Sequence, residues 1–128
     1  MTPDQWIHVI RIAYEVRDWA EDFARKNRFP GDLCGMCAIV SGEISKRLAA
    51  KRIKHEIALS REHAFLIVDE MVVDATASQY TCDQPVVIKP LDDVKSSIHY
   101  KKIETFSNVR DAKKYLARRW PASQQMLQ

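Results

Sequence analysis

Apolar side chains near the start of the chain recur every three or four residues, the spacing that places them on one face of a helix. They are Trp6, Ile10, Ala13, Val16, Ala20 and Phe23. Thr2 and Gln5 fit a capping box around Pro3, which suits a first helical turn. The pattern predicts an amphipathic helix over residues 3–26, ended by the Pro-Gly pair at residues 30–31.

The helical spacing returns over residues 35–51. One face of this stretch is apolar and comprises Cys37, Val40, Ile44 and Leu48. A second helix is therefore predicted, with Cys37 in its first turn and facing the core.

The middle of the chain follows the pattern of strands. Short apolar segments rich in branched residues are typical of buried strands. The candidates are residues 54–59, 64–68, 71–73, 86–89 and 98–103. Asp69 and Glu70 separate two of these segments and predict a tight hairpin.

The C-terminal part returns to a helical pattern. Ser107 or Asn108 can cap a helix that runs to about Arg119 and is stopped by Pro121. The order helix, helix, several antiparallel strands, helix predicts an α+β fold. With 128 residues, the chain is expected to form one domain, residues 1–128.

Composition narrows the class of protein. Apolar residues make up 46% of the chain, which is ordinary for a globular domain. No apolar run approaches the roughly 18 residues of a membrane span, so no membrane partner is expected. The first residues do not resemble a signal peptide, and three cysteines fit a reducing cytoplasm better than a disulfide framework.

The net charge of +3 is concentrated toward the C-terminus, where seven Lys and Arg residues occur against two acidic ones from residue 99 onward. A basic segment of this kind is most often a solvated helix face. Because no aromatic interleaving or base-reading motif accompanies it, no nucleic-acid partner is expected.

Three reactive side chains stand out by their order: Cys37, His63 and Asp74. A thiol, an imidazole and a carboxylate can act as nucleophile, base and orienter of the base. The first turn of a helix carries partial positive charge, which favours a Cys37 thiolate. The hypothesis is that Cys37 attacks a carbonyl carbon, His63 shuttles the proton and Asp74 fixes the imidazole tautomer.

The hairpin decides whether His63 and Asp74 can meet. If residues 69–70 form a two-residue turn, Val68 pairs with Met71. His63 and Asp74 are then diagonal neighbours on one face, with centres roughly 7–8 Å apart. A shift of one residue would place the two side chains on opposite faces.

Three segments resemble those of transglutaminase-like, papain-related cysteine proteins. They are Gly35-Met-Cys37, His63-Ala-Phe65 and Val72-Val-Asp74-Ala-Thr76. The resemblance covers about residues 33–80 and implies a papain/transglutaminase-like fold, with N-terminal helices packed on an antiparallel sheet and a C-terminal helix. It also implies catalytic roles for Cys37, His63 and Asp74 in a family of amide-transfer enzymes, peptidases and deamidases, some of which have lost catalysis.

The chain departs from this family at several points. Phe65 replaces the usual tryptophan, and no glutamine lies just upstream of Cys37 to bind an oxyanion. Backbone amides at the helix start could serve instead. Cys34 is a second thiol near the candidate nucleophile, but Gly35 precedes Cys37 by two residues, as the family glycine precedes its cysteine.

Other interpretations remain open. Cys34 and Cys37 could form a redox dithiol, although no buried strand is predicted before them. Zinc could be held by Cys34, Cys37, His63 and Cys82, although no second Cys-x-x-Cys pair follows. The same fold could also be a noncatalytic protein-binding module, with each of the three residues in an ordinary structural role.

The sequence-based interpretation is a cysteine hydrolase or acyl transferase that acts on an amide bond of a protein or peptide. The chain is short, and it has no Gly-rich phosphate loop, so no nucleotide or coenzyme is expected. A catalytic thiolate requires no metal, so no cofactor is expected either. Simple hydrolysis is favoured because no site for a second substrate can be named.

Overall fold

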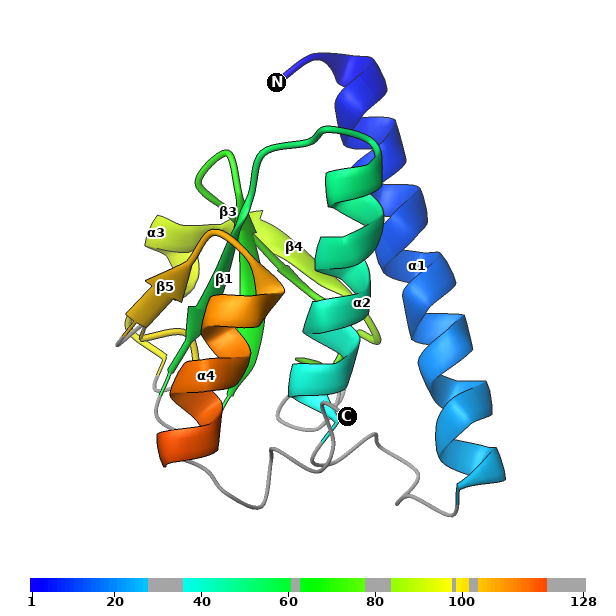
Figure 1. Ribbon diagram of the computed structural model, residues 1–128. Coiled ribbons are helices and arrows are strands. Elements are labelled where there is room, and N and C mark those ends of the chain that lie inside the picture. Colours follow the sequence, from blue (N-terminus) through cyan, green and yellow to red (C-terminus); the bar gives the residue numbers. More distant parts are fainter. Residues whose placement is uncertain (28–35, 61–62, 78–83, 98, 102–103, 120–128) are drawn as a thin grey trace.

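Two long helices pack on a five-stranded antiparallel sheet (Figure 1). The computed structural model describes residues 1–27, 36–60, 63–77, 84–97, 99–101 and 104–119. Its elements are α1 Pro3–Lys26, α2 Cys37–Ala50, β1 Glu56–Leu59, β2 Ala64–Val68, β3 Met71–Asp74, β4 Val87–Pro90, α3 Leu91–Val94, β5 Glu104–Phe106 and α4 Val109–Arg119. The strand order is β4-β3-β2-β1-β5. The predicted α+β class is confirmed.

Helix α1 begins and ends as predicted. The backbone N–H of Gln5 donates to Thr2 Oγ1 at 3.1 Å, and the N–H of Thr2 donates to Gln5 Oε1 at 3.0 Å, which completes the capping box. The buried face is Val9, Ile12, Ala13, Val16, Ala20 and Ala24, together with Arg17. Ile10 is 43% exposed, so its predicted place on the inner face is wrong. The predicted Ala13, Val16 and Ala20 are buried, and Trp6 and Phe23 pack against the core as partly buried residues.

Helix α2 lies between α1 and the sheet and runs antiparallel to α1 (Figure 1). It begins at Cys37, and its inner face holds the four predicted apolar residues, Cys37, Val40, Ile44 and Leu48. Residue 35, where the predicted helix began, lies outside the described residues. One turn after Cys37, Ser41 Oγ donates to the carbonyl oxygen of Ala64 at 3.1 Å. This bond fastens the first turns of α2 to the start of β2.

Replacing Ser41 with alanine is expected to lower the free energy of unfolding by about 1 kcal/mol. The buried carbonyl of Ala64 would lose a donor, which costs about 1–3 kcal/mol. The higher helix propensity of alanine offsets about 0.5 kcal/mol of that cost. Urea unfolding of Ser41→Ala, beside the exposed control Ser96→Ala, measures the difference. A Ser41→Ala variant as stable as the wild type would show that this bond does not anchor α2.

The β2–β3 hairpin has the predicted turn and register. Asp69 and Glu70 have φ angles of 48° and 64°, the left-handed values that a two-residue type I′ turn requires at both central positions. Val68 pairs with Met71, and Leu66 pairs with Val73. The side chains of residues 63 and 74 are thereby placed on the same face of the sheet.

The two faces of the sheet are covered differently. Alternate side chains along β2 and β3, including Leu66, Val68 and Val73, pack against α1 and α2. The side chains between them, including Phe65 and Val72, point to the other face. Tyr100 and the apolar residues of α3 cover that second face.

The C-terminal third differs most from prediction. Strand β4 starts one residue later than expected, and the short α3 that follows it was not predicted. The strand predicted over residues 98–103 is wrong at residues 99–100, which form a turn. The strand of this region, β5, begins only at Glu104. Residues 98 and 102–103 lie outside the described residues. Because Tyr100 N–H bonds the nearby carbonyl of Ser97 at 3.1 Å, it is not available to a strand ladder.

Helix α4 matches its prediction and resolves the choice of cap. Asn108 Oδ1 accepts from the backbone N–H of Asp111 at 2.9 Å, the bond of an N-cap to the third helical residue. Asn108 rather than Ser107 therefore caps the helix. Phe106 and Tyr115 connect α4 with the first turn of α2, because both pack on the cluster that contains Cys37 and Ala38.

Candidate active site

His63 and Asp74 lie at the open end of the β2–β3 hairpin, away from its turn. His63 immediately precedes β2, and Asp74 is the last residue of β3. The ring Nε2 of His63 lies 2.7 Å from Asp74 Oδ2, so the two residues are hydrogen-bonded. Their side chains are 0% and 1% exposed. The diagonal contact predicted from the hairpin register is thus present.

The Asp74 carboxylate accepts four hydrogen bonds. Its Oδ1 receives the backbone N–H of Thr76 at 2.8 Å and the Thr76 hydroxyl at 3.1 Å. Its Oδ2 receives the His63 ring and the Tyr100 hydroxyl, each at 2.7 Å. Burial alone would raise the pKa of Asp74, but the bonds from His63, Tyr100 and Thr76 prevail and hold the pKa below its ordinary value. Asp74 is therefore an anion at neutral pH.

The His63 ring is held between this carboxylate and the Cys37 thiol. Burial would lower the pKa of His63, but hydrogen bonding to Asp74 and Cys37 outweighs burial and raises the pKa to about 9. The ring is therefore an imidazolium at neutral pH. Since Nε2 is bonded to Asp74, Nδ1 is the ring nitrogen that remains for the thiol.

Cys37 approaches His63 from the N-terminus of α2. It is a free cysteine and is 7% exposed. The first backbone bond of the helix runs from Val40 N–H to the Met36 carbonyl, so the amides of residues 37–39 have no partner within the helix. Among the described residues no side chain caps this end, and the first turn holds no acidic residue. The amides and the helix dipole favour an anion beside Cys37.

Two aromatic rings surround the imidazole. Phe65 lies two residues along the chain and stacks on His63, with ring centroids 6.0 Å apart. Tyr100 meets the His63 ring edge-on at 5.9 Å and the Phe65 ring edge-on at 5.1 Å. The hydrogen bond between His63 and Asp74 is therefore enclosed by apolar surface, which strengthens it.

Arg17 on α1 braces the chain just beyond Asp74. Its guanidinium Nη1 donates to the carbonyl oxygens of Ala75 at 3.0 Å and Pro85 at 3.3 Å, and its Nε pairs with Glu21 at 2.9 Å. The side chain is buried. Arg17 thus fixes the backbone that follows β3.

Sequence reasoning found the three reactive residues and missed Tyr100 and Arg17. Asp74 also caps the loop that follows it, the ordinary structural role open to it from the sequence, because the backbone N–H of Thr76 donates to Asp74 Oδ1 at 2.8 Å. Tyr100 had been placed in a predicted strand, and no spacing rule connects it with Asp74. Arg17 occurs in an amphipathic helix, where a basic residue predicts a solvated side chain. Nothing in the pattern marked either residue for the site.

Several residues of the sequence-based alternatives lie outside the described part of the chain. These are Cys34 and Cys82, and Gly35 of the cysteine segment lies outside it as well. The dithiol and the four-ligand zinc site both depend on Cys34, so both stay predictions. Within the residues that the structure describes, no three His, Cys, Asp or Glu side chains are grouped to hold a metal ion. No described helix is long and apolar enough to cross a membrane.

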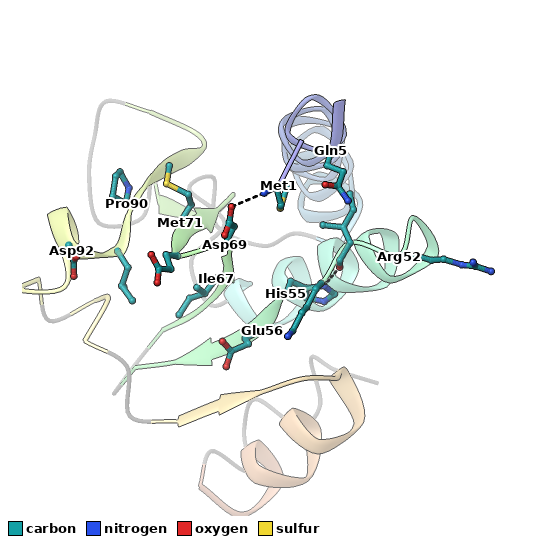
Figure 2. A pocket seen from close by; sticks show the side chains of 14 residues that line it. Met1, Gln5, Arg52, His55, Glu56, Ile67, Asp69, Met71, Pro90 and Asp92 are labelled. Carbon is teal, nitrogen blue, oxygen red and sulfur yellow. Dashed lines mark hydrogen bonds and ion pairs between the residues drawn. The ribbon is translucent and has the colours of Figure 1, made fainter. Parts of the chain in front are cut away.

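A hollow lies at the other end of the hairpin (Figure 2). It has a volume of about 810 Å³, and side chains of both charges line it. The N-terminal amine of Met1 reaches across one wall and pairs with Asp69 Oδ2 at 3.2 Å. Because Asp69 is in the hairpin turn, the length of β2 separates this hollow from His63. The hollow is not part of the candidate active site.

Comparison of the chain with protein-family models, with curated proteins and with solved structures finds no match. The function of the protein is therefore inferred from its residues and their geometry.

Proposed function

We propose that the protein is a cysteine-nucleophile hydrolase that acts on an amide bond of a protein or peptide, with Cys37, His63 and Asp74 as its catalytic triad. The observation that supports this most is the buried bond of 2.7 Å between His63 Nε2 and Asp74 Oδ2, with Cys37 near enough to the same ring to help raise its pKa. The nucleophile therefore lies next to its base, and the base is bonded to the carboxylate that orients it.

The first half-reaction forms an acyl-enzyme. The Cys37 thiolate attacks the carbonyl carbon of the amide, a C–S bond forms, and the carbonyl electron pair moves onto oxygen. The intermediate then collapses, the C–N bond breaks, and the protonated His63 ring gives its Nδ1 proton to the departing nitrogen. The products are a thioester on Cys37 and a free amine or ammonia.

The second half-reaction regenerates the Cys37 thiolate and releases the acyl group as a carboxylic acid. Neutral His63 takes a proton from water, the oxygen attacks the thioester carbon, and the C–S bond breaks with the electron pair returning to sulfur. Asp74 keeps the proton on Nε2 throughout, so that Nδ1 alternates between base and acid. An amine in place of water would make the same site an acyl transferase.

The start of α2 supports a place for the oxyanion. The backbone amides of Cys37 and Ala38 have no helical partner and lie beside the attacking sulfur. Donors that are fixed before the reaction stabilise negative charge developing on the carbonyl oxygen. These amides can take the role for which the sequence offered no glutamine.

Within the α+β class, the arrangement of elements supports the proposal that the fold is papain/transglutaminase-like. A helix that begins at the cysteine packs on an antiparallel sheet, and neighbouring strands of that sheet carry the histidine and the aspartate. This is the arrangement that the resemblance of the three sequence segments implies. We include a cytoplasmic location in the proposal, because three cysteines, an odd number, fit a reducing compartment better than a disulfide framework.

The burial of the site favours a second candidate, a noncatalytic protein-binding module. His63 and Asp74 are almost fully enclosed, and Cys37 is 7% exposed. A charged, hydrogen-bonded pair in such a place can serve to hold a helix against a sheet. The two candidates differ in one property: only the hydrolase requires Cys37 to react.

Cys37 is expected to be the thiol that alkylates first. A protonated imidazole and the amides of a helix start both favour a thiolate, which is the reactive form. Limiting iodoacetamide is added to the folded protein near neutral pH, and the adduct is mapped by peptide mass spectrometry. Cys34→Ala and Cys82→Ala serve as controls and should leave the labelling of Cys37 unchanged. Preferential labelling of Cys34 or Cys82 would remove the basis of the assignment.

A further inference from the structure

Tyr100 contacts the Asp74 carboxylate, yet the proposed mechanism gives its hydroxyl no role. We propose that Tyr100 is a positioning residue of the triad, whose hydroxyl holds the Asp74 carboxylate in the single orientation that receives the His63 ring. The inference deepens the proposed function and rests on it. It gives a role to a side chain that does not contact the reacting atoms.

Tyr100 and His63 bond the same carboxylate oxygen of Asp74. The Tyr100 hydroxyl and His63 Nε2 both approach Asp74 Oδ2, each at 2.7 Å, while Thr76 occupies Oδ1 with two donors. A rotated carboxylate would break bonds on both oxygens. With the Tyr100 hydroxyl absent, His63 would be the one donor described for Oδ2, and no second donor would hold that oxygen in place for the ring.

Tyr100 is itself placed by rigid local structure. The turns that lead to it are closed by backbone bonds from Lys95 to Leu91 at 2.8 Å, from Ser97 to Val94 at 2.9 Å and from Tyr100 to Ser97 at 3.1 Å. Its ring is 6% exposed and packs edge-on against His63 and Phe65. The short helix α3 therefore serves to bring the hydroxyl to Asp74.

The hydrogen bond from the Tyr100 hydroxyl to Asp74 Oδ2 also affects the charge of the pair. A donor on Oδ2 stabilises the charged form of Asp74, so the carboxylate does not take the proton from His63. Among the described residues, the groups that face the pair are Cys37 at the start of α2, Thr76 after β3 and Tyr100 before β5. From α1, Arg17 binds the neighbouring Ala75 carbonyl. Of these groups, only Tyr100 donates to the oxygen that His63 uses.

The variant Tyr100→Phe tests the inference, because it removes the hydroxyl and keeps the ring. The rate of Cys37 alkylation by iodoacetamide is measured between about pH 4 and about pH 9, spanning the ordinary pKa of carboxyl and imidazole groups. In Tyr100→Phe, the acid limb of the profile should move to higher pH. The rate on that limb should fall by about ten- to a hundredfold, the effect of losing a hydrogen bond to a charged group. Tyr14→Phe on the exposed side of α1 is the matched control and should follow the wild type.

The outcomes separate the two proposals. If wild-type Cys37 alkylates preferentially and Tyr100→Phe has the wild-type profile, the role of Tyr100 is refuted and the proposed function stands. If wild-type Cys37 is inert, both are refuted. Should Tyr100→Phe fail to fold, proton NMR of the wild type decides. A nuclear Overhauser effect between the Tyr100 hydroxyl proton and the His63 Nε2 proton is expected when both lie on Oδ2, and its absence from resolved signals would overturn the role.

Discussion

Asp74→Asn is expected to keep the fold and to lower Cys37-dependent activity by about 10²–10⁴-fold. The amide oxygen of asparagine can still accept both bonds from Thr76, because it can occupy the place of Oδ1. The amide NH₂ would then face His63 and donate to Nε2. The ring would carry its proton on Nδ1, toward Cys37, and a base in that tautomer cannot take a proton from the thiol.

Two measurements on Asp74→Asn separate chemistry from folding. Circular dichroism and thermal unfolding should show a folded protein, while the alkylation rate of Cys37 and any turnover should fall together. Asp93→Asn, an exposed residue of α3, is the matched control and should behave like the wild type. A folded Asp74→Asn protein with wild-type reactivity would mean that His63 and Asp74 do not act as a unit.

The free energy of unfolding is expected to fall by about 3 kcal/mol as pH rises from about 6.5 to about 9 and beyond. The pKa of His63 is raised from 6.5 to about 9 in the folded protein. Its charged form therefore stabilises the fold fully below about pH 6.5, and this contribution is lost as pH rises through the folded pKa. Asp74 acts in the opposite sense, because its pKa is lowered: its contribution is present above the ordinary carboxyl range and is lost as pH falls.

Urea unfolding at about pH 6 and about pH 10 measures the alkaline loss, relative to the ordinary imidazole pKa near 6.5. Because lysines and tyrosines also titrate at high pH, the informative quantity is the difference between the wild type and His63→Gln. The variant should be less stable at about pH 6 and should lack about 3 kcal/mol of the pH-dependent loss. Equal losses in the two proteins would show that His63 carries no charge in the folded state.

The parts of the fold that sequence predicted are those set by local rules. The capping box of Thr2 and Gln5 fixed the start of α1, and the two-residue turn at 69–70 fixed the register of β2 and β3. That register alone brings His63 to Asp74, because both residues belong to one hairpin. The pair could be predicted for this reason, although its hydrogen bond and its burial could not.

What sequence missed depends on contacts between distant segments. Tyr100 lies 26 residues from Asp74, and Arg17 lies 58 residues from Ala75, so no local period connects them. The exposed position of Ile10 was missed for a related reason: the helical period accommodates Ile10 as well as Val9 and Ile12, and only the packing of the domain leaves Ile10 43% exposed. The strand predicted over residues 98–103 failed because the turn that positions Tyr100 occupies part of it.

The most direct test of the central claim compares wild type and Cys37→Ala on the proteins of a cell lysate. Intact-mass and peptide data are searched for products that depend on Cys37. New peptide termini or gains of one dalton are the hydrolysis products that the proposed mechanism predicts, whereas crosslinks would indicate transfer to an amine. If no product depends on Cys37 and a partner instead co-purifies equally with both forms, the catalytic account is contradicted and the protein is a binding module.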